Sequence, residues 1–148
     1  HKSDRVSSRG YSRSTVQSSV YFGEKMRLAY LAQAYSHEDP KVREARFELA
    51  VAAIHRLERE FPGILVYSPI VHYHHTATIF GAPTDAEFYQ RRNLAMLERC
   101  DMMFLLDDEP ASRSKGVAQE VKWAEALSIS IIRTNPEYWN VSYNGKSQ

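Results

Sequence analysis

The feature that most constrains the fold of this 148-residue chain is a regular alternation between two hydrophobic patterns. Short, uninterrupted apolar runs are typical of strands that are buried on both faces. Between them lie longer segments in which apolar residues recur every three or four positions, as along one face of a helix. The runs that predict strands are residues 27–33, 64–68, 102–106 and 129–132, and the segments that predict helices are residues 39–61, 84–99 and 114–127. The order β-α-β-α-β-α-β predicts an α/β fold with a parallel sheet.

Right-handed crossover connections place the helices of such a sheet on both of its faces. We therefore expect a doubly wound, flavodoxin-like or Rossmann-like arrangement of four to five parallel strands. Local signals mark two helix starts. Asp39 followed by Pro40 suits an N-cap and a first turn, and residues 84–87 fit a capping box. Residues 69–83, which contain a glycine and a proline near their end, and residues 107–113 are predicted to be loops.

The first 25 residues of the chain differ in composition from the rest. Residues 1–25 contain seven serines and three arginines and carry a charge of +3, from five basic and two acidic residues. Such a stretch cannot bury enough apolar surface to offset its ordering entropy, so we expect a mobile tail or an expression remnant. An arm that binds nucleic acid is the alternative. Residues 26–148 are then a single domain.

Charge, cysteine content and hydropathy exclude several classes of protein. The 19 basic and 18 acidic residues nearly balance, which argues against a protein that binds nucleic acid mainly through its phosphates. A single cysteine, Cys100, excludes an internal disulfide and a cysteine-based zinc site. The apolar runs are too short to span a bilayer, and no signal-peptide pattern opens the chain. We expect a small, soluble, cytoplasmic domain with no membrane partner.

Three polar residues, Glu120, Asn93 and Tyr30, occupy positions at which the pattern predicts apolar side chains. Glu120 lies on the inward stripe of its helix, between Val117 and Ala124. A carboxyl group that faces a core or a cleft is paired, neutral or functional. Glu120 is therefore a candidate catalytic residue, and a structural ion pair or an outward-reaching boundary carboxylate is the alternative. Asn93 and Tyr30 have the corresponding alternative of hydrogen-bonded structural residues.

Two further polar clusters lie beyond the carboxyl ends of predicted strands, where parallel sheets bind ligands. Ser114, Lys115 and Gly116 open a helix, and free backbone N–H groups at a positive helix end suit an anion such as phosphate; an ordinary serine N-cap is the alternative. Residues 72–75, His-Tyr-His-His, lack a placed carboxylate or cysteine, so we expect a polar cleft rim and no metal. The sequence contains no G-x-G-x-x-G, Walker or G-x-S-x-G motif.

Residues 114–120, Ser-Lys-Gly-Val-Ala-Gln-Glu, followed by Ala124, resemble the S-x-G-V-x-x-E-x-x-x-A motif of the nucleoside 2-deoxyribosyltransferase-like superfamily. This superfamily includes 2′-deoxynucleoside 5′-monophosphate N-glycosidases. Three further segments resemble the family in the same order, namely residues 30–36, 68–72 and 94–101. The second of them is similar to a loop common in a largely uncharacterised branch. The resemblance covers residues 26–133, most of the predicted domain.

The resemblance implies cleavage of the N-glycosidic bond of nucleosides or of their 5′-monophosphates. It assigns Glu120 as the nucleophile that attacks the anomeric carbon, which gives a glycosyl-enzyme that water or a second base resolves, as in retaining glycosidases. It also implies that Tyr30 positions the nucleophile and the sugar, and that Ser114 contacts the 5′-phosphate, which favours monophosphates. The expected substrate-binding residues are Gln33, Ser36, His72, Ser114, Lys115 and Gly116.

One position departs from the family pattern. The family's helix carries an aspartate, proposed to protonate the leaving base, where this chain has Asn93. An amide can hydrogen-bond a base or a sugar but cannot act as a general acid. Asp85, at the start of the same predicted helix, and His72, of a residue type that titrates near neutral pH, are candidate substitutes. The expected catalytic residues are therefore Glu120, Tyr30, Asn93 and Asp85.

We therefore predict an N-glycosidase or N-deoxyribosyltransferase-like enzyme that acts on a nucleoside or nucleotide. It needs no metal or organic cofactor, because side chains and backbone groups supply the nucleophile and the binding groups. The resemblance also implies a homodimer or a higher homo-oligomer whose neighbours help to close the site. The alternative is a non-catalytic nucleotide-binding sensor or regulatory module that has lost the acid. Asn93 favours this alternative, and Glu120 argues against it.

Overall fold

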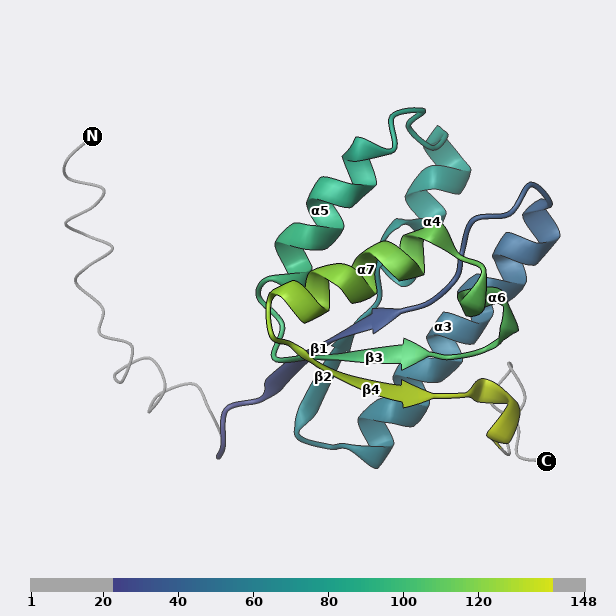
Figure 1. The fold of residues 1–148 in the computed structure, drawn as a ribbon. Helices are drawn as coiled ribbons and strands as arrows, with labels where there is room; N and C mark the ends of the chain where they lie inside the picture. Colours follow the sequence, from purple (N-terminus) through teal and green to yellow (C-terminus); the bar gives the residue numbers. More distant parts are fainter. Residues whose placement is uncertain (1–22, 140–148) are drawn as a thin grey trace, which may run out of the picture.

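The computed structural model describes residues 23–139 and contains the predicted parallel sheet. Its strands are β1 (Arg27–Ala32), β2 (Ile64–Tyr67), β3 (Met102–Leu106) and β4 (Ser130–Thr134). They are hydrogen-bonded in the order β2-β1-β3-β4, and Figure 1 labels each of them. All three pairings are parallel, which confirms the α/β fold and the flavodoxin-like strand order. Residues 1–22 of the predicted tail lie outside the described residues, so the domain division stays a prediction.

Helices connect all successive strands, including the predicted helices at residues 39–61, 84–99 and 114–127. They are α3 (Pro40–Glu60), α4 (Pro69–Phe80), α5 (Glu87–Leu97), α6 (Glu109–Ser112) and α7 (Lys115–Ala126), and a 3₁₀ turn, η1 (Pro136–Tyr138), follows β4. The start of α3 confirms the predicted cap, because the Asp39 carboxylate accepts a hydrogen bond from the Lys41 N–H at 2.9 Å and Pro40 occupies the first turn.

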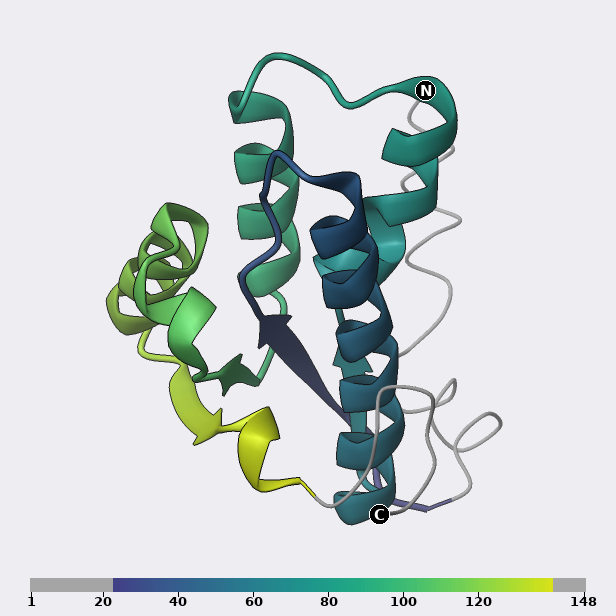
Figure 2. The ribbon, with the colours of Figure 1, turned by 90° about the vertical axis from the view of Figure 1, so that its right-hand side faces the viewer.

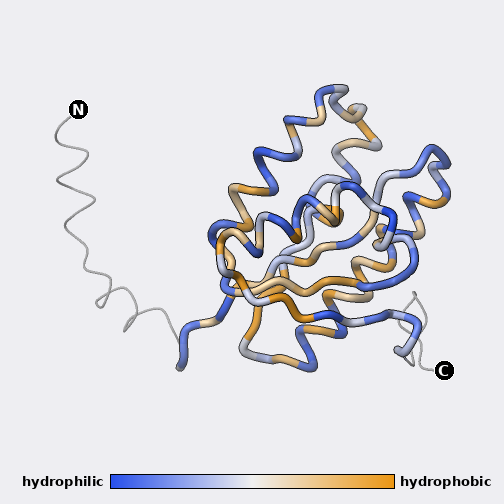
Figure 3. The backbone as a smooth tube through the Cα atoms, viewed as in Figure 1, coloured by the Kyte–Doolittle hydropathy of each residue, from blue (hydrophilic) through white to orange (hydrophobic). Residues whose placement is uncertain are grey.

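The sheet is covered on both faces, as predicted. Figure 2 shows α3 and α7 on opposite sides of the strands, and Figure 3 shows the apolar residues concentrated along the strands between them. The core beneath α3 consists of Ala29, Leu31, Leu49, Ala53, Leu57, Val66, Met102, Phe104 and Leu106. The core beneath α5 and α7 consists of Tyr30, Ala32, Leu97, Cys100, Met103, Leu105, Ala111, Val117 and Ala124. Because side chains alternate along a strand, consecutive residues of β1 enter different cores, and so do consecutive residues of β3.

The prediction that residues 69–83 form a loop was wrong, because Pro69–Phe80 is helix α4. Ser68 caps it by accepting a hydrogen bond from the Val71 N–H at 3.1 Å, and proline occupies its first turn. The β-branched and aromatic residues that fill this segment have low helix propensity, which hid the helix from a reading of local preferences. Packing of α4 against α3 outweighs that preference.

Two shorter predictions also need correction. Residues 84–87 do not form a capping box, since α5 begins at Glu87 and the N-cap residue Ala86 has no side chain that can accept a hydrogen bond. The Asp85 carboxylate instead accepts a hydrogen bond from the Glu87 N–H at 2.9 Å. The polar loop at residues 107–113 contains the one-turn helix α6, which Asp108 caps through the Ala111 N–H. Within the described part of the chain, no helix is long and apolar enough to cross a membrane.

Candidate active site

The centre of the site is a buried pair of oxygen atoms, one from β1 and one from α7. The Tyr30 hydroxyl donates a hydrogen bond to Glu120 Oε2. Tyr30 is completely buried and Glu120 is 8% exposed. Strand alternation turns Tyr30 toward α7, and the helical spacing of the stripe brings Glu120 down between Val117 and Ala124, as the sequence predicted.

The electrostatics of this pair suit a reactive carboxylate. Burial raises the pKa of Glu120 to about 7, while the hydrogen bond from Tyr30 acts in the opposite direction. Burial, followed by the neighbouring Glu120, raises the pKa of Tyr30 far above its ordinary value, so its hydroxyl stays protonated and donates. Glu120 is therefore poorly solvated, held in place by the Tyr30 hydroxyl, and has a pKa closer to neutral pH than an exposed glutamate has. Such a group can act as a nucleophile or as a base.

Glu120 does not take part in a structural ion pair. The four ion pairs among the described residues involve other acids, and its hydrogen bond comes from a neutral phenol. The side chain also stays inside the protein, which excludes the alternative of a boundary carboxylate that reaches outward. A buried carboxylate without a cation opposes folding at neutral pH, so its presence calls for a reason other than stability.

A row of aromatic side chains leads from this pair to α4 and α5. The Tyr30 ring centroid lies 6.0 Å from that of Tyr67, which lies 5.9 Å from the ring of His72. His72 itself is exposed on α4. Burial raises the pKa of Tyr67 to about 12, and Tyr73, Cys100 and Glu120 add to the shift. The Tyr67 ring thus links His72 to Tyr30.

Asn93 and Gln33 each hold a polar atom without a partner in the described part of the chain. The Oδ1 atom of Asn93, on α5, and the Oε1 atom of Gln33, after β1, are both buried and accept no hydrogen bond. The Gln33 amide nitrogen donates to the Arg46 carbonyl at 2.8 Å. Buried acceptors without donors are rare in native proteins. Each is therefore a position at which a ligand or a water molecule could donate a hydrogen bond.

Gln33 lines a cavity of about 360 Å³ on the α3 side of the fold. At this edge of the sheet, the chain leaves β1 toward one face and leaves its neighbour β3 toward the other face. The cavity is lined by Gln33, Ala34, Lys41, Val42, Ala45, Arg46, Leu49, Asp108 and Pro110. Ser36 is exposed nearby, and its carbonyl oxygen accepts from Arg46 Nη1 at 2.9 Å. The structure therefore groups Gln33 and Ser36 around Arg46, apart from the Tyr30–Glu120 pair.

The start of α7 has the geometry of a serine N-cap. Ser114 Oγ accepts from the Val117 N–H at 3.1 Å, while Lys115 and Gly116 are exposed and contribute the first two N–H groups of the helix, which have no intrahelical acceptor. A Cβ on Gly116 would make only an ordinary contact, 3.7 Å from Ser114 Oγ, so packing does not require glycine here. The N-cap is confirmed, and anion binding at this end stays a prediction.

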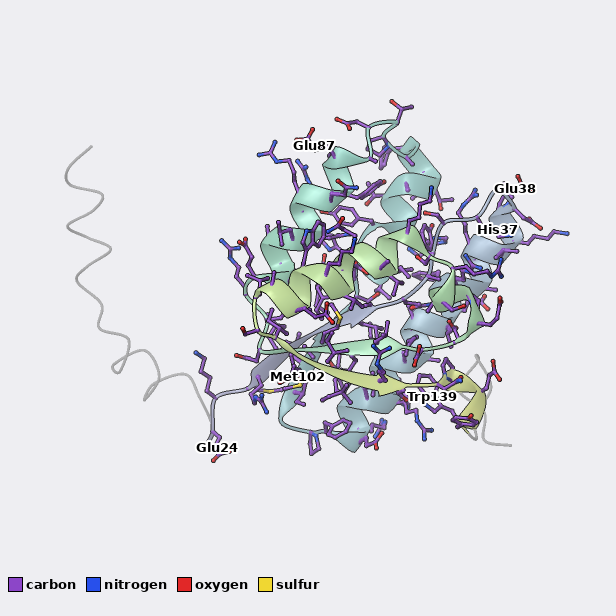
Figure 4. All side chains as sticks on the ribbon, viewed as in Figure 1. Glu24, His37, Glu38, Glu87, Met102 and Trp139 are labelled. Atoms are coloured by element: carbon purple, nitrogen blue, oxygen red, sulfur yellow. The ribbon has the colours of Figure 1, made fainter. Side chains whose placement is uncertain are left out.

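Asp85 lies apart from the buried pair. It is exposed in the connection between α4 and α5, and the labelled Glu87 in Figure 4 marks the start of α5 beside it. Its carboxylate accepts the Glu87 N–H, as described above. Within residues 23–139, no three His, Cys, Asp or Glu side chains group closely enough to hold a metal ion.

The sequence did not reveal the role of His74. This residue is 4% exposed and lies between the Tyr35 hydroxyl and the Glu44 carboxylate, whereas residues 72–75 were expected to form a cleft rim. The signal that could have found it is the spacing of four residues from Ile70. If residues 69–80 are a helix, Ile70 and His74 share its buried face.

Residues 26–135 match the model of a family described as "Domain of unknown function (DUF1937)". Among solved structures, the chain is similar to a 2-desoxiribosyltransferase from Leishmania mexicana, at 21% sequence identity and a TM-score of 0.47. That similarity covers 82% of this chain and 77% of the other. No curated protein sequence matches the chain.

Proposed function

We propose that this chain, which belongs to the family described as "Domain of unknown function (DUF1937)", cleaves the N-glycosidic bond of nucleosides or nucleoside 5′-monophosphates. Glu120 attacks the anomeric carbon as the bond to the base breaks, and the electron pair of that bond leaves with the base. The product is a glycosyl ester of Glu120. Water or a second base then attacks the same carbon and frees the carboxylate, so the configuration at that carbon is retained overall.

The observation that carries this proposal is the buried Glu120 carboxyl group held by the Tyr30 hydroxyl. A nucleophilic carboxylate must be poorly solvated and fixed in direction while it remains able to ionise, and burial, the pKa of about 7 and the hydrogen bond from the phenol fit these needs. The resemblance of residues 114–120 to the glutamate motif supports the same role from the sequence.

The start of α7 supports a 5′-monophosphate as the preferred substrate. Its two free N–H groups and the Lys115 ammonium lie at the positive end of the helix that carries Glu120. A phosphate bound there would anchor the substrate to the element that holds the nucleophile. Arg113, the adjacent cation, already pairs with Glu109 at 2.6 Å, so Lys115 is the side chain free to contribute.

The test is chromatography of the free base released from a panel of nucleosides and 5′-monophosphates, with and without an acceptor base. Glu120→Gln keeps the size of the side chain and removes the nucleophile. Glu125→Gln, an exposed position on the same helix, is the matched control. We expect release by the wild type and by Glu125→Gln, and a loss of about a thousandfold or more in Glu120→Gln, because that variant lacks the reacting group. Undiminished release by Glu120→Gln would refute the mechanism.

A non-catalytic nucleotide-binding module is the second candidate, and Asn93 favours it. The unpartnered Asn93 Oδ1 can accept a hydrogen bond from a base amino group or a sugar hydroxyl, but the amide cannot serve as an acid. This candidate predicts that nucleotides raise the melting temperature of the wild type while no base is released. Base release that depends on Glu120 would exclude it.

A further inference from the structure

The cavity beside Gln33 lies where an open parallel sheet binds ligands. β1 and β3 are neighbours, and α3 and α7, which follow them, cover opposite faces of the sheet (Figure 2). The crevice beyond the carboxyl ends of two such strands is the usual ligand site of this architecture. The cavity, of about 360 Å³, is formed by the residues after β1, the first half of α3 and the start of α6. Its position and its size suit a small ligand.

This cavity is separate from the Tyr30–Glu120 pair. The Gln33 amide nitrogen donates to the carbonyl oxygen of Arg46 at 2.8 Å, which fixes the Gln33 side chain against α3. Leu49, another residue of the cavity wall, belongs to the core beneath α3. Tyr30 lies in the core beneath α5 and α7, and Glu120 meets it there, on the other face of the sheet. A ligand in the cavity would therefore occupy a second site, apart from the candidate nucleophile.

Gln33 contributes an acceptor that lacks a donor. The residue is 7% exposed, and its Oε1 atom accepts no hydrogen bond within the described part of the chain. A buried acceptor without a partner opposes folding, so such atoms are rare unless a ligand or water supplies the donor. Because the amide nitrogen is committed to the Arg46 carbonyl, the oxygen is the atom that remains for an N–H or O–H group of a ligand.

Three charged side chains, Lys41, Arg46 and Asp108, line the same cavity without pairing with one another. None of them takes part in an ion pair among the described residues. Arg46 Nη1 donates to the carbonyl oxygens of Tyr35 and Ser36, at 3.3 and 2.9 Å, which holds the guanidinium group in one orientation. Its other N–H groups have no acceptor in residues 23–139, so they remain for an anionic group of a ligand.

Asp108 supplies the negative charge of the cavity. Its Oδ1 atom accepts a hydrogen bond from the Ala111 N–H at 3.1 Å, which caps α6. Burial raises the pKa of Asp108, because its carboxylate is poorly hydrated, while the Ala111 N–H and the Arg46 charge lower it. A cationic group of a ligand beside this carboxylate would replace the hydration that burial removes.

The rest of the cavity wall is apolar and aliphatic. It consists of Ala34, Val42, Ala45, Leu49 and Pro110, of which the first and fourth are buried and the others half-buried. No aromatic ring lines the cavity, so it lacks the flat surfaces on which a nucleobase stacks. A phosphate dianion would also meet the charge of Asp108. The wall therefore favours an aliphatic group over a nucleotide.

We propose that this cavity binds an α-amino acid with an aliphatic side chain. Arg46 and Lys41 bind the carboxylate of the ligand, and its ammonium group donates to Asp108 and to Gln33 Oε1. The aliphatic side chain packs on the apolar wall. A zwitterion thus joins opposite charges that line one cavity and do not pair directly. The inference does not rest on the proposed function, because none of these residues takes part in the proposed cleavage.

The test measures binding to the full chain by isothermal titration calorimetry. The probes are L-leucine, L-isoleucine and L-valine, together with two analogues of leucine. In α-hydroxyisocaproate a hydroxyl replaces the ammonium group, and isoamylamine lacks the carboxylate. We expect at least one of the three amino acids to bind, and both analogues to bind about tenfold or more weakly, the factor for a lost charge-assisted hydrogen bond. Binding of none of the three, or equal binding of the amino acid and the hydroxy acid, would overturn the proposal.

Two variants of adjacent residues test the site itself. Asp108→Asn removes the charge but keeps an oxygen that can accept the Ala111 N–H, so α6 stays capped. We expect it to bind the amino acid about tenfold more weakly and to lose the preference over the hydroxy acid. Asp107→Asn, the same change at an exposed position outside the cavity, should bind both as the wild type does. A preference that survives in Asp108→Asn would refute the assignment of the ammonium site.

Gln33→Leu tests the unpartnered acceptor. We expect it to weaken binding of the amino acid by about threefold to tenfold, the range for a neutral hydrogen bond. Asp108→Asn remains informative if this buried variant fails to fold. Unchanged binding in a folded Gln33→Leu would remove Gln33 from the site.

A nucleoside 5′-monophosphate in the same titrations separates this proposal from the proposed function. If the nucleotide binds more weakly to Gln33→Leu than to the wild type and no amino acid binds, the cavity is a nucleotide site and the proposal is wrong. Base release is measured independently through Glu120→Gln. Failure of base release would overturn the proposed function and leave the amino-acid site intact, and failure of amino-acid binding would do the reverse.

Discussion

The two faces of the sheet bury different kinds of side chain. Beneath α3, the strands contribute only apolar residues, with Leu31 and Phe104 fully enclosed. Beneath α5 and α7, the same strands contribute Tyr30, and Glu120 meets it from α7. Apolar burial stabilises the fold, whereas burial of a carboxylate opposes it. The comparison indicates that apolar burial on both faces stabilises the fold, and that the face beneath α5 and α7 also holds the candidate reactive carboxylate.

The largest effect that should separate the two faces comes from Phe104→Ala. Phe104 is fully buried in the α3 core, 5.5 Å from the Phe61 ring, and its loss leaves a cavity. We expect the free energy of unfolding to fall by about 3–5 kcal/mol, measured by urea denaturation. Base release per folded molecule should be unchanged at low temperature. A loss below about 1 kcal/mol would contradict the contribution of the Phe104 side chain to the stability of this core.

On the other face, Glu120→Gln should raise the free energy of unfolding rather than lower it. The folded protein raises the pKa of Glu120 from 4.5 to about 7, so the unfolded chain ionises first and stability falls as pH rises between these values. The neutral amide escapes this loss, so the variant should be more stable than the wild type by up to about 3 kcal/mol at pH 8. Near pH 4.5 the two should differ little. Urea melts at both pH values measure this, and equal stability at pH 8 would contradict the raised pKa.

Tyr30→Phe should show whether Tyr30 controls the pKa of Glu120, and we expect it to reduce base release less than Glu120→Gln does. It removes the hydrogen bond that lowers the pKa of Glu120, so that pKa rises further and less carboxylate is ionised at pH 7. We expect base release at pH 7 to fall about tenfold or more, since a hydrogen bond to a charged group contributes about 1.5–3 kcal/mol. The acid limb of the pH–rate profile should move to higher pH. A profile that keeps its position would show that Tyr30 does not tune Glu120.

The smallest effects should come from the two helix caps, Asp39 on α3 and Ser114 on α7. Replacement of either by alanine should lower the unfolding free energy by about 1 kcal/mol. If the start of α7 binds phosphate, Ser114→Ala should also reduce the preference for 5′-monophosphates over nucleosides, whereas Asp39→Ala should not. Thermal melts and the ratio of the two kcat/KM values provide the measurement. An unchanged ratio in Ser114→Ala would remove Ser114 from the substrate site.

Local patterns predicted most of the fold but missed helix α4, the one-turn helix α6 and the exact start of α5. The strands were found because a centrally buried strand such as Met102–Leu106 is apolar at every position. Helix α4 was missed because its residues have low helix propensity and its stability comes from contacts with α3. Helix propensity describes a segment in isolation, whereas helix α4 is stabilised by its contacts with α3.

The candidate site shows the same division. Glu120 and Tyr30 were each identified because a polar residue interrupts an apolar stripe or strand, but their hydrogen bond joins residues 90 positions apart. The contacts of His74 gave no such signal, since Tyr35 and Glu44 lie 39 and 30 positions from His74 on other elements. Spacing within one helix or strand reveals a face, and it does not reveal which faces meet.

The sequence by itself determined the four strands with helices α3, α5 and α7 between them, the parallel sheet, and the two polar residues that its apolar pattern could not accommodate, because these follow from periodicity and burial along the chain. Only the tertiary structure decided that Tyr30 donates to Glu120, that residues 69–80 are helical and that His74 joins Tyr35 to Glu44. These features depend on distances between elements, which packing sets and local sequence does not encode.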